Sequence, residues 1–200
     1  MRKRLLILGC VGLAIALTIA VVIGAGQAGD ADRATGEDVP PLSLAAVSEP
    51  IAGAPGELAA LRARVNVLQP GAKRALDAQL RALRGHPVVV NLWASWCDPC
   101  RHELPFLQRQ AVKRGATVAF LGVNSNDNDS DARRLGRRYP MPYPSIVDPR
   151  LAIAGEYGAR GLPATAFYDA SGKRVLVHQG GFTSETQLAA EIDRYALGRG

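Results

Sequence analysis

The chain has 200 residues, with 24 lysines and arginines against 18 acidic residues, and a formal net charge of +6. Three of the positive charges are Arg2, Lys3 and Arg4, so the remainder is only weakly basic. Because it also carries no nucleic-acid motif and no internal repeat, we expect one globular domain of ordinary size that binds no nucleic acid.

An uncharged apolar stretch from Leu5 to about Gly26 follows these three cations. It is long enough to cross a bilayer, and the cations favour a cytoplasmic N-terminus. We therefore expect residues 1–28 to form a single-pass signal-anchor helix in the cell membrane, with the rest of the chain outside. The alternative is a signal that is cleaved near Ala28, which would release a secreted protein. Cys10 lies early in the stretch, which favours a transmembrane cysteine over the lipid-bearing cysteine of a lipoprotein.

Residues 29–56 are rich in Gly, Ala, Asp and Pro and show little periodicity, which predicts a flexible linker. Short apolar pieces at Leu42, Leu44 and Val47 leave a second interpretation open, an irregular extension packed on the domain. The domain itself is expected over residues 57–200.

Apolar residues at helical spacing then predict a helix from about Pro70 to Leu83, and an apolar run predicts a buried strand over 88–92. Cys97 and Cys100 follow this strand. A strand that leads into a helix leaves unpaired N–H groups beside the first sulfur, which favours its thiolate, so Cys97 is the expected nucleophile. Cys100 is close enough to attack a mixed disulfide on Cys97 and is the expected resolving thiol. A zinc site would need a second Cys or His pair, and a purely structural disulfide would close a very small loop.

A second buried strand is predicted over 117–123, parallel to the first. A polar loop and a short basic helix follow, in which two pairs of arginines lie one turn apart: Arg133 with Arg137, and Arg134 with Arg138. A solvated helix face is the simple explanation, and a docking patch for an acidic partner is the alternative. Asp127, Asp129 and Asp131 alternate as in a calcium loop, but the glycine and glutamate of an EF-hand are missing.

Four prolines between 139 and 149 predict irregular structure, and a short helix follows over 151–157. Residues 164–168 and 174–178 predict an antiparallel hairpin, and residues 183–197 a closing helix.

Two motifs in this order carry a resemblance to a known family. The first comprises Trp93, Ala94, Trp96, Cys97, Pro99 and Cys100, with Pro105 five residues further on, and the second covers residues 161–167. The chain resembles the thioredoxin superfamily, in particular its TlpA/ResA/DsbE-like branch of membrane-anchored thiol–disulfide oxidoreductases. The resemblance implies an α/β thioredoxin fold, with a mixed central sheet flanked by helices and an insertion after the second core strand.

The resemblance also implies site residues. Leu162 and Pro163 correspond to a cis-proline segment that, with Trp96, would bind an extended substrate. Thioredoxins keep a buried aspartate six residues before the first cysteine, where this chain has Asn91. The branch resembled here uses a glutamate after the motif instead, and Glu103 is the expected proton relay. The alternative for Glu103 is a surface glutamate near a helix N-terminus.

The expected function is extracytoplasmic thiol–disulfide exchange without a cofactor. Asp98 beside Cys97 should disfavour the thiolate, which favours a reductant of protein disulfides, as in cytochrome c maturation. The expected partners are disulfide- or dithiol-containing client proteins, apocytochrome c among them, and a membrane thiol–disulfide electron carrier. Two alternatives remain: a disulfide-forming oxidase, and a copper-binding carrier that uses Cys97, Cys100 and His178. The Pro-x-x-x-Thr-x-x-Cys pattern of a peroxidase is missing.

Overall fold

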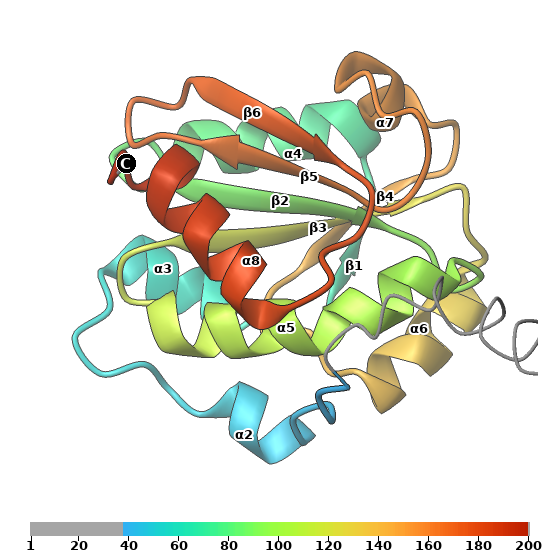
Figure 1. Ribbon diagram of the computed structural model, residues 1–200, viewed down its shortest axis with the longest axis horizontal. Coiled ribbons are helices and arrows are strands. Elements are labelled where there is room, and N and C mark those ends of the chain that lie inside the picture. Colours follow the sequence, from blue (N-terminus) through green and yellow to red (C-terminus); the bar gives the residue numbers. More distant parts are fainter. Residues whose placement is uncertain (1–37, 200) are drawn as a thin grey trace, which may run out of the picture. The chain divides into compact units, whose positions relative to one another are not determined.

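The computed structural model describes residues 38–199. They contain one six-stranded sheet, with strand order β1-β4-β3-β2-β5-β6, and the helices that pack on it (Figure 1). Its strands are β1 (Leu68–Gln69), β2 (Val88–Trp93), β3 (Ala119–Ser125), β4 (Ser145–Asp148), β5 (Ala164–Tyr168) and β6 (Arg174–Gln179). β1, β4, β3 and β2 run parallel, while β5 pairs antiparallel with both β2 and β6. The mixed sheet is the one that the family resemblance implied.

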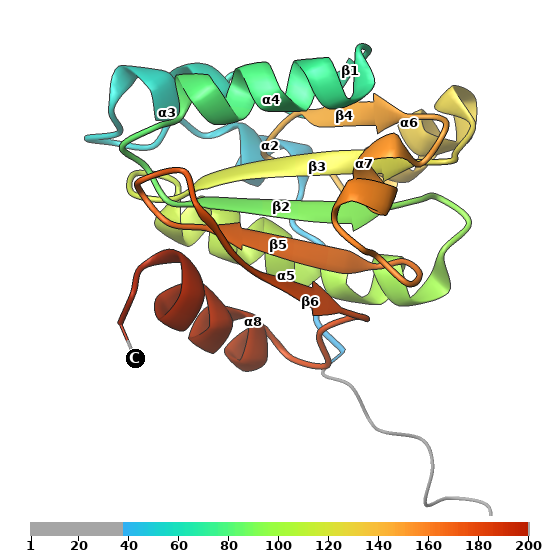
Figure 2. The ribbon, with the colours of Figure 1, turned by 90° about the horizontal axis from the view of Figure 1, so that it is seen from above.

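Helices cover both faces of this sheet. They are α2 (Leu44–Ser48), α3 (Gly56–Arg62), α4 (Ala72–Ala82), α5 (Asp98–Arg114), α6 (Asp129–Arg138), α7 (Ala152–Glu156) and α8 (Glu185–Glu191), which continues as the π-helical segment η1 (Ile192–Ala196). Figure 2 shows α4 on one side of the sheet and α5 and α8 on the other. The part of the chain where the insertion is expected contains α6 and β4, which lie between β3 and α7.

The side chains of β2 alternate between the two faces of the sheet, which explains why helices must pack on both faces. All six of its residues are buried. Val89 and Trp93 belong to the core cluster with α5 and α8, whereas Val88, Val90 and Leu92 belong to the cluster with α3, α4 and α7. Because successive side chains point to opposite faces, a continuous apolar run is what a central strand between two helical layers requires.

Two short strands were not predicted. β4 lies within the proline-rich segment 139–149, and β1 precedes α4. Both are at one side of the sheet, where β4 pairs with β3 and β1 pairs only with β4. No proline lies between Pro144 and Pro149, so the four residues of β4 keep their N–H groups and can pair with the neighbouring strands.

The expected linker also differs from the structure in its described part, residues 38–56. Leu42 N donates a 2.9 Å hydrogen bond to Gln108 Oε1, and Arg109 of α5 donates to Pro40 O. Val47 in α2 is fully buried. These residues pack on the domain rather than forming a flexible tether, because their few apolar side chains find partners there.

The expected transmembrane helix, residues 1–28, lies outside the described residues. Within 38–199, no helix is long and apolar enough to cross a membrane.

Candidate active site

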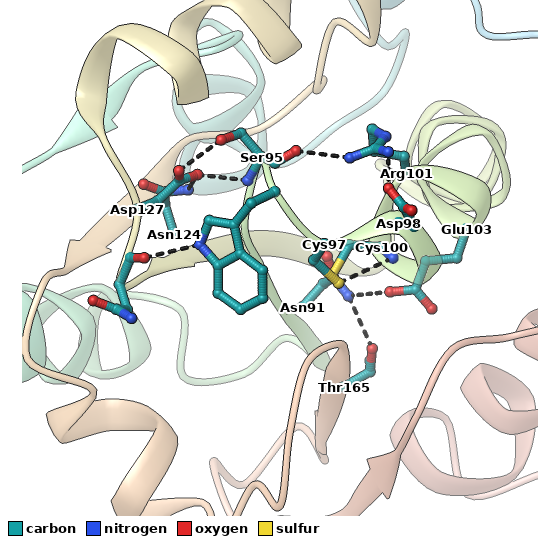
Figure 3. Close-up of a disulfide and its surroundings, with 12 residues drawn as sticks. Asn91, Ser95, Cys97, Asp98, Cys100, Arg101, Glu103, Asn124, Asp127 and Thr165 are labelled. Carbon is teal, nitrogen blue, oxygen red and sulfur yellow. Dashed lines mark hydrogen bonds and ion pairs between the residues drawn. A yellow bond between two sulfur atoms is a disulfide. The ribbon is translucent and has the colours of Figure 1, made fainter.

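The two cysteines lie where β2 leads into α5 (Figure 3). Cys97 is the N-cap residue of this 17-residue helix, and its Sγ accepts a hydrogen bond of 3.2 Å from Cys100 N. The two sulfurs form a disulfide, with an S–S distance of 2.03 Å and Cα atoms 5.3 Å apart. The positive end of a long helix therefore points at Cys97, which favours its thiolate once the pair is reduced.

Burial distinguishes the two cysteine residues. Cys97 is 3% exposed and Cys100 is fully buried. An incoming disulfide therefore reaches Cys97 first, whereas Cys100 is reached from within the protein. This arrangement fits the roles of nucleophile and resolving thiol that we predicted for them.

Glu103 is a fully buried carboxyl group on α5, three residues after Cys100. Its Oε2 accepts a hydrogen bond of 3.0 Å from Phe182 N, and its Oε1 accepts one of 2.7 Å from Asn91 Nδ2. Desolvation nevertheless dominates these bonds and raises the pKa of Glu103 to about 8. The group can therefore gain or lose a proton close to neutral pH, and the alternative of a surface glutamate is wrong.

Asn91 connects Glu103 to β5, the strand that follows the predicted substrate-binding residues Leu162 and Pro163. Its Nδ2 donates both to Glu103 and, over 3.2 Å, to Thr165 Oγ1 of β5 (Figure 3). Its Oδ1 is buried and has no hydrogen-bond partner. Because an unpaired buried carbonyl oxygen is costly, a rotation of this amide would be favoured whenever Glu103 becomes a donor.

Leu162 and Pro163 are the predicted substrate-binding segment, and the peptide bond between them is cis. Gly181 brings this segment to the active-site helix. A Cβ atom built on Gly181 would lie 3.4 Å from Pro163 Cγ, 3.6 Å from Pro99 O and 3.7 Å from Glu103 Oε2. The cis proline, the dipeptide between the cysteines and the buried carboxyl group therefore converge at one glycine.

Asp127 fixes the loop that precedes Cys97. Its carboxylate accepts hydrogen bonds of 2.6 Å from Ser95 N, 2.6 Å from Ser95 Oγ, 2.7 Å from Asn124 Nδ2 and 2.8 Å from Asn128 N. Arg101 donates to Ser95 O over 2.9 Å from the other side. The main chain beside the nucleophile is thus held by one carboxylate and one guanidinium.

Trp96 is the large apolar side chain exposed beside the disulfide, with 58% of its surface accessible. Its Nε1 donates to Asn126 O over 2.9 Å, which holds the ring in place. Trp96 also lines a groove, together with Leu151, Leu162 and several small residues of α7 and the following loop. Trp96 and Leu162, two of the predicted substrate-binding residues, therefore border the same groove.

His178, a residue of the copper-carrier alternative, does not join the cysteines. Its Nδ1 lies 3.1 Å from Glu191 Oε1, and its ring stacks on Phe182 with centroids 4.3 Å apart. Among residues 38–199, no group of three or more His, Cys, Asp or Glu side chains is placed to hold a metal ion.

Comparison with known proteins adds to this geometry. The sequence profile of the AhpC/TSA family matches residues 68–175, which include β1 to β5, both cysteines and Pro163. The chain belongs to the AhpC/TSA family. Among AhpC/TSA-like relatives, the thiol-disulfide oxidoreductase ResA of Halalkalibacterium halodurans is 32% identical over 108 residues, which cover 54% of this chain and 61% of ResA. The thioredoxin-like protein YneN of Bacillus subtilis is 28% identical over 119 residues, covering 58% of this chain and 69% of YneN.

Solved structures agree on the fold of this AhpC/TSA-family protein. A Chlorobium tepidum protein assigned as the thiol:disulfide interchange protein DsbE matches with a TM-score of 0.53 and 29% identity, over 56% of this chain and 82% of its own. DsbF of MTB, in mixed oxidised and reduced forms, matches with a TM-score of 0.52 and 27% identity over the same shares. The thioredoxin-like fold is thus established, while this chain spans only 61% of the length of the Halalkalibacterium ResA.

Within the AhpC/TSA family, this chain has a dithiol where a peroxidase would have its peroxidatic pattern. The residues seven and three positions before Cys97 are Val90 and Ala94, not the Pro and Thr of that pattern. Both are buried apolar residues. The local chemistry is therefore that of a Cys-x-x-Cys pair.

Sequence reasoning missed Asp127 and Gly181. Asp127 follows β3 by two residues, and β3 pairs with β2 so that Asn124 is level with Trp93. A polar residue just beyond the carboxyl end of the neighbouring strand is a signal that could have identified Asp127. Gly181 had no comparable signal, because its importance comes from a loop that closes on α5 from a distant part of the chain.

Proposed function

We propose that this protein is a thiol–disulfide oxidoreductase whose Cys97–Cys100 pair cycles between dithiol and disulfide as it reduces client disulfides or oxidises client dithiols. The observation that carries the proposal is the disulfide at the N-terminus of α5, together with the convergence of Pro163, Pro99 and Glu103 at Gly181. The names of ResA and DsbE-like relatives support the same activity.

In the reducing direction, the Cys97 thiolate attacks one sulfur of the client disulfide. The other client sulfur leaves as a thiolate and takes a proton. Cys100, once deprotonated, then attacks Cys97 Sγ, which forms the Cys97–Cys100 disulfide and releases the second client thiol. Two electrons pass from the enzyme dithiol to the client, and the reverse sequence oxidises a client dithiol.

Glu103 is suited to the proton transfer in the second half of this cycle. A carboxyl group with a pKa of about 8 is present as both acid and base near neutral pH, so it can accept a proton from Cys100 without a large energetic cost. Asn91 holds the carboxyl group in place through its 2.7 Å hydrogen bond. Water cannot take over this role easily because both Cys100 and Glu103 are fully buried.

The reducing direction is favoured by the residue after Cys97. Asp98 places a carboxylate there, which should disfavour the thiolate and so stabilise the disulfide relative to the dithiol. Arg101 forms an ion pair with Asp98, and the two side chains are 37% and 81% exposed, so part of this charge is compensated. We infer a reductase that serves cytochrome c maturation by reducing a haem-binding Cys-x-x-Cys-His segment, with a disulfide-forming oxidase as the alternative.

The reduction potential of the Cys97–Cys100 pair tests the direction. The full chain would be equilibrated in glutathione and dithiothreitol buffers and its thiols trapped by alkylation. A potential well below the glutathione range is expected for a reductase that receives electrons from a membrane thiol–disulfide carrier. A potential near that of strongly oxidising proteins would overturn the reductase proposal and leave the exchange activity intact. A pair that exchanges with neither buffer would overturn the activity itself.

We also propose that residues 1–28 anchor the protein in the cell membrane, with the domain outside. Support comes from the uncharged stretch after Arg4 and from the three cations that precede it. Extraction of membranes at alkaline pH tests this location. The intact chain should remain in the membrane fraction, whereas a soluble chain that begins near residue 29 would indicate a cleaved signal.

A further inference from the structure

Trp96 lines two hollows on the surface beside Cys97. One is the groove described above, which also includes Leu151 and Leu162. The other is a hollow of about 410 Å³, and the residues that line it are Ser95, Trp96, Arg101, Asp131, Arg134, Leu135 and Arg138. We call it the basic hollow, since it contains three arginines and one acid. Both hollows include Trp96, so one extended segment of a bound polypeptide can contact both.

Two helices supply the arginines of the basic hollow. α6 contributes Arg134 and Arg138, one turn apart, and α5 contributes Arg101. Arg134 pairs with Asp131 over 2.7 Å, and Arg101 pairs with Asp98. Arg138 has no ion pair among residues 38–199, and its guanidinium lies over the ring of the adjacent tyrosine, 5.7 Å from the centroid.

These internal ion pairs leave the hollow able to bind an external carboxylate. The Arg134 side chain is 70% exposed and its partner Asp131 is 41% exposed. Exposed pairs of this kind contribute little to stability, so a second carboxylate can compete for the guanidinium at small cost. Arg138 forms no ion pair within residues 38–199, so it can bind an external carboxylate without losing an internal partner. A hollow with three cations and an aromatic wall is therefore complementary to an acidic segment of polypeptide.

We propose that the basic hollow binds an acidic residue that flanks the reacting cysteine of the client protein. The inference rests on the proposed oxidoreductase function and adds a preference among clients. A client segment that lies in the groove of Leu162 and continues past Trp96 would bring its next residues to the hollow of Arg134 and Arg138, since Trp96 lines both. The favourable charge raises the association rate constant of such clients and lowers their dissociation rate constant.

The same helix provides a matched control. Arg133 and Arg137 are also one turn apart and, like Arg134 and Arg138, are exposed. They line a different hollow, together with Asn66, Leu68, Ala132, Gly136, Met141 and Ser145. Removing either pair changes the net charge of the protein by the same amount, so the two double variants separate a local contact from a general effect of charge.

The test uses the full chain, reduced with dithiothreitol and freed of it, in single-turnover reduction of synthetic peptides. Each peptide contains a Cys-Ala-Ala-Cys disulfide, flanked by two aspartates or by two asparagines, placed before or after the cysteines. At low salt, the second-order rate constant of peptide reduction should be about five-fold higher for the better acidic peptide than for its asparagine counterpart, an effect typical of a rim charge. The ratio of these two rate constants, acidic peptide over asparagine peptide, should approach one in 0.5 M sodium chloride, because salt screens the charges.

In the Arg134→Ala/Arg138→Ala variant the ratio should fall to about one, and in the Arg133→Ala/Arg137→Ala variant it should stay near five. Asp131→Asn, which frees Arg134, should raise it. A ratio of one in the unsubstituted protein, or an equal loss in both double variants, would overturn the inference while leaving the oxidoreductase proposal in place. Failure to reduce any of the peptides would instead overturn the oxidoreductase proposal on which it depends.

Discussion

Glu103 is the residue whose charge state matters most to both stability and chemistry. Its ordinary pKa of 4.5 is raised to about 8 by burial. Between these two pH values the folded protein holds a proton that the unfolded chain releases. The free energy of unfolding therefore falls as pH rises through this window, by about 3 to 5 kcal/mol in total.

Glu103→Gln should remove this pH dependence. The variant can keep the hydrogen bond from Phe182 N, and its new N–H group can donate to Asn91 Oδ1, which now lacks a partner, after that amide rotates. We expect it to match the natural protein near pH 5 and to be more stable at pH 9, as measured by urea unfolding across that range. Release of the reduced client should slow at least ten-fold, because the proton acceptor is lost. Parallel stability curves for the two proteins would contradict the raised pKa.

Asp127 makes a second prediction at the scale of one residue. Asp127→Ala would leave four donors, two of them on Ser95, without their acceptor. We expect a loss of about 2 to 4 kcal/mol in the free energy of unfolding and a fall of ten-fold or more in the second-order rate constant of client reduction, since the loop before Cys97 loses its anchor. Urea unfolding and single-turnover client reduction measure the two effects.

Asp129→Ala is the control for this substitution. Asp129 lies two residues further on, in the first turn of α6, and its side chain is exposed. Only its favourable interaction with the helix N-terminus is lost, about 0.5 kcal/mol. If the two variants lose the same amount of stability, the four hydrogen bonds to Asp127 do not contribute as we infer.

At the scale of the elements, the centre of the sheet depends on close approach at Gly122 in β3. A Cβ atom there would lie 2.1 Å from Ser145 Oγ and 2.9 Å from Trp93 Nε1. These two atoms form a buried hydrogen bond of 3.1 Å. Gly122→Ala should therefore cost about 3 kcal/mol or more, because it overpacks the core and breaks this bond.

Gly155 in α7 offers the matched control, because a Cβ atom built there meets nothing within 4 Å. Gly155→Ala should be neutral or stabilise the protein by up to about 1 kcal/mol, since alanine favours a helix. Thermal or urea unfolding of both variants compares the two glycines directly. A Gly122→Ala protein as stable as Gly155→Ala would mean that β3 and β4 are not packed as described.

The spacing of apolar residues in the sequence was sufficient to predict the helices and strands that bury a complete apolar face. The helix from Pro70 to Leu83, the two parallel strands and the hairpin were predicted and correspond to α4, β2, β3, β5 and β6. β1 and β4 were missed because they have two and four residues and their stability comes from pairing across the sheet. The packed extension at residues 38–56 was left as an alternative for the same reason, since its few apolar residues carry no periodic signal.

The candidate site likewise contains some residues that could be predicted from the sequence and others that could not. The cysteines, the cis proline and Glu103 could be inferred from spacing and family resemblance, because each belongs to a local motif. Asp127 and the bond between Asn91 and Thr165 depend on β3 and β5 lying on either side of β2, with Asn91 level with Thr165. Only the sheet order brings these side chains together, and a single sequence does not specify it.

At the scale of the whole molecule, the redox state of one disulfide and the stability of the fold are linked. If folding stabilises the disulfide more than the dithiol, the reduction potential of the folded protein falls, and each 30 mV adds about 1.4 kcal/mol to the stability of the oxidised form. For a reductase we therefore expect the oxidised full chain to be more stable than the reduced chain, by about 3 kcal/mol. Urea unfolding with and without dithiothreitol measures this difference.

The variant Cys97→Ser/Cys100→Ser is the control, because it retains Cys10 and so reports any effect of that third thiol or of the reagent. Its unfolding curve should not respond to dithiothreitol. A reduced chain that is more stable than the oxidised one would mean that the fold favours the dithiol. The helix N-terminus at Cys97 would then outweigh Asp98, whose charge Arg101 already compensates in part, and the protein would act as a disulfide-forming catalyst.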